Sequence, residues 1–264
     1  MDREPAVAGR FYTSRAEALR REIDGFLQAG GARVRARGIV APHAGYVYSG
    51  AIAGAVYARV DVPARVLVLG PNHTGQGAEV ALWPGGAWRL PTGAVPVDPE
   101  LTAALAASPL VEQDTDAHLL EHSLEVQLPF LARVRPGVAI AALCLGRLRF
   151  LDCEVLGKAV ARAASAAGAL VVASSDMSHY VSAAEAREKD HLALERILAL
   201  DPEGLYAVVH RERISMCGII PATVMLVAAI EQGATRAELV RYGSSGDVTG
   251  DDRQVVGYAG VLVA

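Results

Sequence analysis

The sequence predicts an α/β fold: one three-layer α/β/α domain spanning residues 1–264, with a mainly parallel or mixed central sheet. Short apolar segments with the composition of buried strands alternate with segments of helical periodicity. That alternation is typical of a sheet covered by helices on both faces. The chain is 52% hydrophobic and has no Pro/Gly/Ser-rich stretch long enough to separate two domains. Its length is sufficient for one large core.

The first half of the chain begins with a predicted helix. Ser14 is a plausible N-cap, and Glu17 follows three residues later, which is the spacing of a capping box. Apolar runs that end in a histidine predict the next strands, and an alternating, turn-rich stretch predicts a hairpin or meander. The expected elements are a helix over 14–28, a strand over 38–43, a helix over 49–60, a strand over 65–73 and the hairpin over 78–98.

The second half begins with DAHLLEHSLEVQLPFLARV, for which helical spacing predicts one helix over 116–134. Leucines form its expected core stripe, and His118, Glu121, His122 and Glu125 lie on another face. After it we expect a strand over 137–146, a helix over 150–164, a strand over 168–180, helices over 183–200 and 202–210, a core helix over 222–232, and strands over 238–243 and 254–264. The polar stretch 244–251 between the last strands is a turn or a flap over a pocket.

Composition argues against several classes of protein. The formal charge is −4, so no basic surface indicates a nucleic-acid partner. The longest apolar run, residues 219–230, is too short to span a bilayer and predicts no membrane partner. The N-terminus lacks the apolar region of a signal peptide. Three cysteines indicate a reducing compartment, and we expect a cytoplasmic protein in which Cys144 and Cys153 pack in the core.

Three predicted strands end in residues that can carry chemistry: His43, His73, and Asp176 with His179. Because ligands of such folds bind beyond the carboxyl ends of the strands, these residues favour a site there. Two imidazoles bind a transition metal well, although each ring could instead be hydrogen-bonded to backbone. Spacing leaves the third ligand open among Asp176, Glu121, Glu125, Asp247 and Cys217.

Asp176 and His179 are three residues apart, so they share a face if the segment turns into a helix. A carboxylate there would steer an imidazole that moves protons. The alternative is that Ser174 or Asp176 caps the following helix.

The run HLLEH, residues 118–122, matches the H-x-x-E-H pattern of inverted zinc peptidases. On a helix, His118 and His122 would chelate zinc with Glu121 as base. The competing interpretation is an ordinary polar helix face. The dinucleotide-binding and phosphate-loop glycine motifs are both absent, so nucleotide binding has little support.

Taken together and in order, AVAGRFY, APHAGYVYSG, LGPNHTG, EHSLEVQLPFL, SSDMSHY, MCG and SGDVTGD resemble the Memo family nearly end to end, and most of all its AmmeMemoRadiSam system protein B members. That family is similar in fold to the class III extradiol dioxygenases, which hold non-haem Fe(II) with two histidines and a carboxylate. The resemblance implies metal ligation by His43, His73 and Cys217. It also implies a catalytic role for His179 and a pocket position for His122.

From this resemblance we expect Asp176 and Glu125 to orient the site and Fe(II) to be the metal, with Cu or Zn as alternatives, because a thiolate is a softer ligand than a carboxylate. The expected function is redox or oxygenase chemistry on a small molecule. The alternative is a non-catalytic metal- or ligand-binding protein that works with AMMECR-type and radical-SAM partners. The resemblance disfavours the zinc peptidase.

Overall fold

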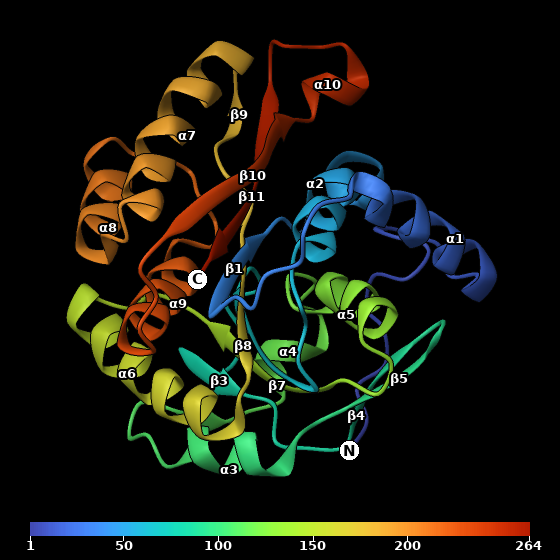
Figure 1. Ribbon diagram of the computed structural model, residues 1–264, viewed down its shortest axis with the longest axis vertical. Helices are drawn as coiled ribbons and strands as arrows, with labels where there is room; N and C mark the ends of the chain where they lie inside the picture. Colours follow the sequence, from blue (N-terminus) through green and yellow to red (C-terminus); the bar gives the residue numbers. More distant parts are fainter.

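A central mixed sheet with helices on both faces organises the chain (Figure 1), and the computed structural model describes residues 1–264 apart from the side chain of Ala29. The strand order is β10-β11-β1-β8-β2-β7-β3-β6, with β9 paired to β11. Neighbours among β1, β8, β2 and β7 are parallel, whereas β11 and β3 flank this centre in antiparallel pairing. The predicted fold class is therefore confirmed.

The strands of the sheet lie close to most of the predicted ranges. They are β1 (Gly38–Ala41), β2 (Arg65–Pro71), β3 (Val80–Leu82), β6 (Glu112–Gln113), β7 (Ala139–Leu145), β8 (Leu170–Ser174), β9 (His179–Val181), β10 (Ala237–Ser244) and β11 (Val255–Val263). A separate hairpin is formed by β4 (Ala87–Leu90) and β5 (Gly93–Pro96). The helices are α1 (Ala16–Phe26), α2 (Tyr46–Ala58), α3 (Pro99–Ala106), α4 (Asp116–Leu119), α5 (Leu128–Val134), α6 (Phe150–Ala167), α7 (Ala183–Leu198), α8 (Pro202–Arg211), α9 (Ile219–Glu231) and α10 (Gly246–Thr249), with 3₁₀ turns at Leu27–Ala29 and Glu125–Gln127.

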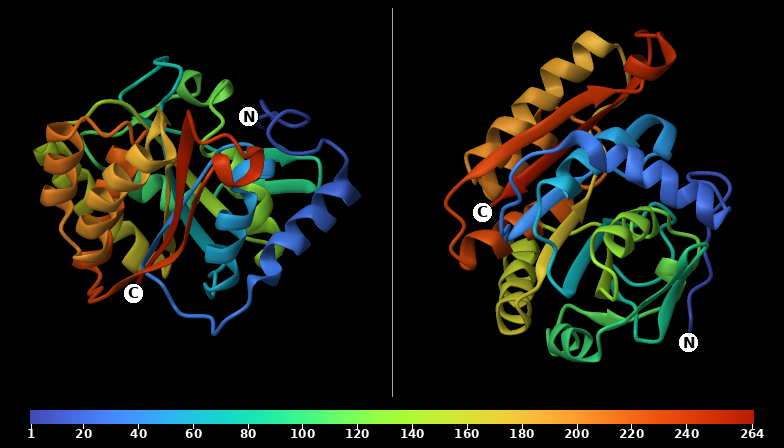
Figure 2. Two further views of the ribbon diagram at one scale, coloured as in Figure 1. Left: turned by 90° about the horizontal axis from the view of Figure 1, so that it is seen from above. Right: turned by 45° about the vertical axis from the view of Figure 1, so that its right-hand side comes forward.

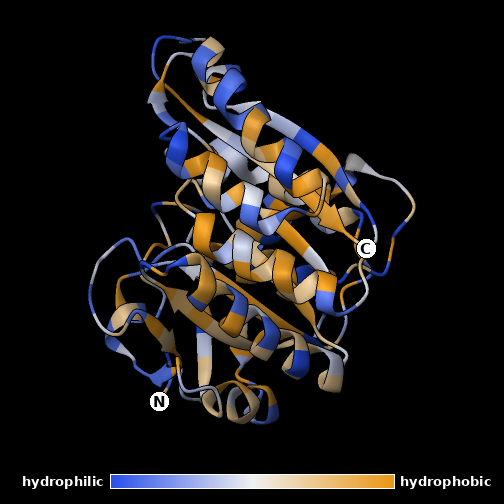
Figure 3. Ribbon diagram, turned by 90° about the vertical axis from the view of Figure 1, so that its left-hand side faces the viewer, coloured by the Kyte–Doolittle hydropathy of each residue, from blue (hydrophilic) through white to orange (hydrophobic). Residues whose placement is uncertain are grey.

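Each face of the sheet has its own apolar core, because successive residues of a strand point to opposite faces. Val40, Leu67 and Val171 belong to one core, and their chain neighbours Ile39, Val66 and Val172 belong to the other. Helices α3 and α6 to α9 lie on the first side and α1, α2 and α5 on the second, as the view from above shows (Figure 2). On the first side the helices carry hydrophobic and hydrophilic residues, whereas the strands behind them are largely hydrophobic (Figure 3). The core positions Cys144 and Cys153 are fully buried, as predicted.

The predicted continuous helix over 116–134 is wrong. The chain forms α4, leaves helical geometry over 120–124, and then forms a 3₁₀ turn and α5. The backbone N–H groups of His122 and Ser123 donate to the Glu121 carboxylate, so a side chain competes with the helix for these amides. Leu120, expected in the core stripe, is 65% exposed.

Two smaller predictions also fail. Ser14 does not cap α1, whose N-cap is Arg15 without a side-chain hydrogen bond. The segment 168–180 divides into β8 and the separate β9, so no helix follows Asp176 directly, and the cap of α7 is Ser182 instead. Within the described chain, no helix combines the length and apolarity that crossing a membrane requires.

Candidate metal centre

Three parallel strands bring the predicted ligands to one edge of the sheet. His43 follows the last residue of β1 by two positions, and His73 and Asp176 follow β2 and β8 in the same way. Because β8 lies between β1 and β2, these residues must converge. Cys217 reaches them from the loop before α9. One donor atom each from His43, His73 and Cys217 lies within 4.8 Å of the others.

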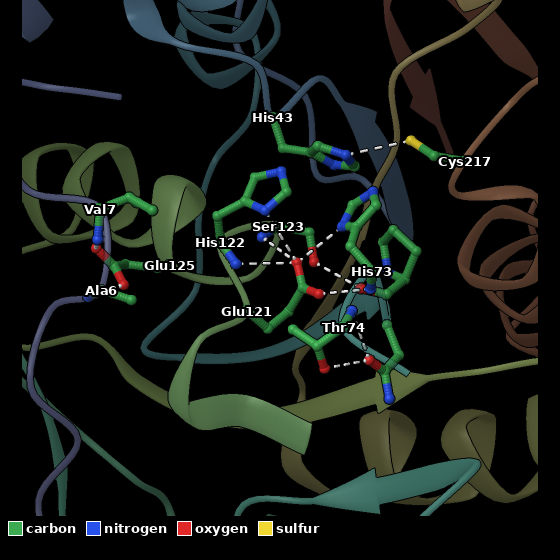
Figure 4. Close-up of polar contacts among 12 residues, drawn as sticks. Ala6, Val7, His43, His73, Thr74, Glu121, His122, Ser123, Glu125 and Cys217 are labelled. Atoms are coloured by element: carbon green, nitrogen blue, oxygen red, sulfur yellow. Dashed lines mark hydrogen bonds and ion pairs between the residues drawn. The ribbon is translucent and has the colours of Figure 1, made fainter. Parts of the chain in front are cut away.

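The His43 ring presents an unprotonated Nε2 to the Cys217 sulfur. The Ser174 hydroxyl, 2.9 Å from Nδ1, donates its only hydrogen to the Ser123 carbonyl oxygen at 2.6 Å. It must therefore accept a hydrogen bond from Nδ1–H, which leaves the Nε2 lone pair free. This nitrogen lies 3.2 Å from Cys217 Sγ (Figure 4). That separation is close to the roughly 3.5 Å expected for a nitrogen and a sulfur bound to one tetrahedral zinc ion.

The His73 ring is oriented in the same sense by Glu121. Its Nδ1–H donates to the carboxylate at 2.9 Å, and its backbone N–H donates to the other carboxylate oxygen at 2.6 Å. In the neutral ring, this tautomer leaves Nε2 of His73 free. A carboxylate that holds the second nitrogen of a histidine is a common support for metal ligands. Two unprotonated imidazole nitrogens and one sulfur form a donor set that fits a transition-metal ion.

Glu121 also belongs to a second group of adjacent donors, with His73 and His122. The rings of these two histidines stack with centroids 4.5 Å apart. Glu121 is completely buried, and its carboxylate already accepts four hydrogen bonds, three of them from backbone amides. Binding a metal here would compete with all four. Glu121 is therefore a positioning residue for the histidines, and the His43–His73–Cys217 group is the candidate metal centre.

Burial controls the protonation of this site. It lowers the pKa of His43 well below its usual range and that of His122 to about 4, so both rings are neutral at pH 7. Burial also raises the pKa of the Cys217 thiol, with a further contribution from Asp176. For Glu121 burial acts in the raising direction, but the His73 hydrogen bond and backbone amides lower its pKa to about 2. Metal binding would have to release the Cys217 thiol proton, whereas His43 already has no proton to lose at its metal-facing nitrogen.

Asp176 is buried beside the candidate centre. Its Oδ1 accepts the backbone N–H of His43 at 2.7 Å, and its Oδ2 lies 4.0 Å from His43 Nε2. Burial raises the pKa of Asp176 to about 6, partly offset by the His43 amide. Its backbone N–H donates to Cys217 Sγ at 3.3 Å. Asp176 thus orders the His43 and Cys217 loops.

His122 and His179 lie beside the His43–His73–Cys217 group but are not part of it. The His122 ring packs against Phe11, with centroids 4.7 Å apart, and against His43 at 5.4 Å. The Nδ1–H of His179 donates to the Ser215 carbonyl oxygen at 2.8 Å, so the predicted Asp176–His179 pair is replaced by a backbone partner. Nε2 of His179 is left available to exchange a proton.

The structure places the other candidates elsewhere. Glu125 does not orient the site, because its carboxylate binds Arg3, Tyr12 and the amides of Ala6 and Val7. Asp247 accepts the Ser244 amide in the last loop. These two acids are therefore excluded as ligands of the His43–His73 pair.

The proposed peptidase chelate is also wrong. His118 is fully buried between Trp83 and Trp88, and its Nε2–H donates to the Ala81 carbonyl oxygen. It does not share a helix face with His122, because the chain leaves helical geometry between them. The supporting residues that the sequence did not reveal are Ser174 and the N-terminal Arg3. For Glu121, the available signal is its adjacency to His122, but the sequence supports it only as a candidate ligand or as a peptidase base.

Comparison with known proteins gives a consistent result over the whole chain. A family model described as "Memo-like protein" matches residues 3–262. A MEMO1 family protein of Aquifex aeolicus is 42% identical over 264 residues, covering 98% of each chain. MEMO1 family proteins of Methanosarcina barkeri and Methanopyrus kandleri are 43% and 40% identical, with 99% of each chain covered. The crystal structure of an uncharacterized protein from Escherichia coli K12 shares the fold, with a TM-score of 0.56 at 13% identity over 87% of this chain and all of that one.

Proposed function

Because the chain belongs to the Memo family, we propose that it is a metal-binding protein whose ion is held by His43, His73 and Cys217 and supports redox chemistry on a small molecule. The observation that carries this proposal is the pair of free Nε2 atoms, each fixed by a hydrogen bond at Nδ1, beside a sulfur. Imidazoles held in this way are pre-organised ligands, which lowers the cost of binding the ion. Fe(II) is the metal we propose, with copper and zinc as competitors for the soft sulfur.

The bound ion would act as a Lewis acid or electron donor toward an oxygen-containing substrate. The residues of the chain would supply orientation and proton transfer. His179 Nε2 is free to accept a proton from a substrate hydroxyl, since Nδ1 is occupied by Ser215. The neutral His122 ring, held between Phe11 and His43, would form a wall of the substrate site.

Metal content tests the first part of the proposal. We expect about one transition-metal ion per chain in protein purified without added metal, and at least about tenfold weaker binding after Cys217→Ser. In Co(II)-loaded protein the same substitution should remove the sulfur-to-metal charge-transfer absorption. Cys153→Ala, a buried cysteine on α6, is the matched control and should retain both. Unchanged absorption in Cys217→Ser would reject sulfur ligation.

Turnover tests the second part. Protein loaded anaerobically with Fe(II) should consume O₂ in the presence of a substrate from a panel of catechols. His179→Ala should retain the metal and lose the O₂ uptake. If metal-loaded protein consumes no O₂ with any diphenol, the oxygenase proposal fails.

The sulfur donor also favours a second candidate, a non-catalytic metal- or ligand-binding partner in a radical-SAM-associated pathway. A thiolate stabilises Zn(II) and Cu(I) more than a carboxylate would, and both suit a structural or transfer role. Such a binder would lose neither metal nor partner binding in His179→Ala. An enzyme would retain the metal and lose activity.

A further inference from the structure

We propose that the cavity beside Cys217 binds a small organic anion with an apolar, planar body, and that Arg147 recognises its negative charge. This inference rests on the proposed function for the identity of the site, and it names the substrate class. The cavity has a volume of about 480 Å³ and includes Asn72, Cys217 and Ile220 in its lining. Such a volume is within the range of small-molecule sites.

Arg147 occupies a position in the fold equivalent to those of the metal-centre residues. It follows the last residue of β7 by two positions, as His43, His73 and Asp176 follow β1, β2 and β8. These four strands are parallel neighbours, so Arg147 lies at the same carboxyl edge of the sheet. Ligands of such sheets bind at this edge.

The backbone of Arg147 is fixed, whereas its guanidinium group is free. The Arg147 amide donates to Glu79 Oε2 at 2.5 Å, and the Gly146 amide donates to the Glu79 carbonyl oxygen at 2.8 Å. A Cβ at Gly146 would lie 1.9 Å from Glu79 Oε2, so a larger residue at this position would displace the Glu79 carboxylate from the Arg147 amide. Across residues 1–264 as described, the guanidinium has no hydrogen-bond or ion-pair partner. It is therefore available to a ligand.

Arg147 borders two cavities, and the charges that line them indicate which one would bind an anion. A second cavity of about 410 Å³ contains His73 and also shares Asn72 and Gly146, but the Glu79 carboxylate lines it. No carboxylate lines the cavity beside Cys217. Its other arginine, Arg149, is paired with Asp152 at 2.8 and 3.1 Å. Arg147 therefore supplies the uncompensated positive charge on the Cys217 side.

The other residues that line the cavity indicate the shape and polarity of the uncharged part of the ligand. Leu145, Leu148, Ile219 and Ile220 are apolar, and the rings of Tyr206 and His210 stack with centroids 4.2 Å apart. The Tyr206 hydroxyl donates to the Leu148 carbonyl oxygen at 3.0 Å, which directs its polar atom to the backbone. A planar, apolar group fits these walls, and its acidic substituent would reach Arg147 while the opposite end faces Cys217.

Benzoate and its neutral isostere benzamide are suitable probes, titrated by calorimetry into Zn(II)-loaded protein so that no turnover is involved. We expect benzoate to bind and Arg147→Gln to weaken it about five- to tenfold, with little effect on benzamide. The matched control Arg149→Gln should change benzoate affinity less than about twofold, because its charge is already paired. Leu148→Trp, which fills the cavity, should abolish binding without changing the zinc content.

Three results would overturn the proposal: no benzoate binding to wild-type protein, equal affinity in Arg147→Gln, or full affinity in Leu148→Trp. The same samples distinguish this failure from failure of the proposed function. Zinc content reports the metal centre independently, and repeating the benzoate titration on metal-free protein reports the cavity alone. If the protein held no zinc but still bound benzoate in an Arg147-dependent way, only the proposed metal centre would be rejected.

Discussion

The buried Glu125 offers the sharpest test of how the N-terminal segment supports the site. Its carboxylate is 0% exposed and forms an ion pair with Arg3 at 2.6 Å. It also accepts hydrogen bonds from the Tyr12 hydroxyl and from the amides of Ala6 and Val7. Arg3 in turn donates to the carbonyl oxygens of residues 118 and 121. Glu125→Gln removes the negative charge and leaves the shape nearly unchanged.

The expected cost follows from the partners that remain. An amide can accept with one oxygen only, so its NH₂ group must face donors that the carboxylate satisfied. The Arg3 guanidinium, 1% exposed, would be left as a buried charge without a counter-ion. Breaking a buried ion pair in this way costs about 3–5 kcal/mol. Because Arg3 holds the backbone that leads into Glu121 and His122, part of this loss should extend to the candidate metal centre.

Urea unfolding at pH 7, followed by fluorescence of Trp83 and Trp88, measures this loss. With an m-value of about 3 kcal/mol/M, the midpoint should fall by about 1–1.7 M. Glu185→Gln is the control, since its pair with Lys189 is exposed and should be worth less than about 1 kcal/mol. A loss below about 1 kcal/mol in Glu125→Gln would refute the argument that this network holds an uncompensated charge.

Three further experiments test the histidine support, the protonation of His118 and the packing around Gly54. Glu121→Gln should weaken metal binding about 10- to 100-fold without changing the stoichiometry, measured by competition with a chelator, because the His73 ring loses its carboxylate. Burial lowers the pKa of His118 to about 4 in the folded protein, whereas in the unfolded chain the ring has its ordinary pKa of about 6.5. Between these two pH values the unfolded chain therefore binds a proton that the folded protein does not. Stability should therefore fall by about 3 kcal/mol as the pH falls from 6.5 to 4, and His118→Gln should flatten this slope in urea titrations; parallel slopes would contradict it. Gly54→Ala should cost about 1–3 kcal/mol, because its Cβ would lie 2.5 Å from Phe26, whereas Gly25→Ala, with open space around it, should gain about 0.5–1 kcal/mol in the same thermal melts.

The strand ends could be predicted from the sequence, whereas the strand order could not. GIVAPH and RVLVLGPNH are short apolar runs that terminate in histidines, and their composition and length identify both as strands. That β8 lies between their strands depends on long-range pairing, which no local pattern encodes. Cys217 lies in a loop with no periodicity, and only the family resemblance distinguished it from the competing acids.

Of the two acids in EHSLE, the sequence predicts Glu125 as the orienting residue, whereas the structure gives this position to Glu121. On the expected helix, Glu121 and Glu125 are four residues apart and therefore share a face. The backbone instead bends around Glu121, whose carboxylate takes two amides that a helix would use. Glu121 consequently faces the histidines and Glu125 faces the N-terminus. A hydrophobic stripe predicts which residues are buried, but it does not show that a buried carboxylate will break the helix.

The candidate ligands are ordered by groups from elements other than their own. His43, which follows β1, is oriented by Ser174 at the end of β8, and His73, which follows β2, is oriented by Glu121 from the bend after α4. Gln127 donates to both Ser174 Oγ and the Pro42 carbonyl oxygen, which connects that bend to the first loop. Each ring orientation therefore depends on correct pairing of the whole sheet, and the unfolded chain has no preformed site. For this reason metal affinity should be linked to global stability, and residues outside the candidate metal centre, such as Arg3, should contribute to its geometry.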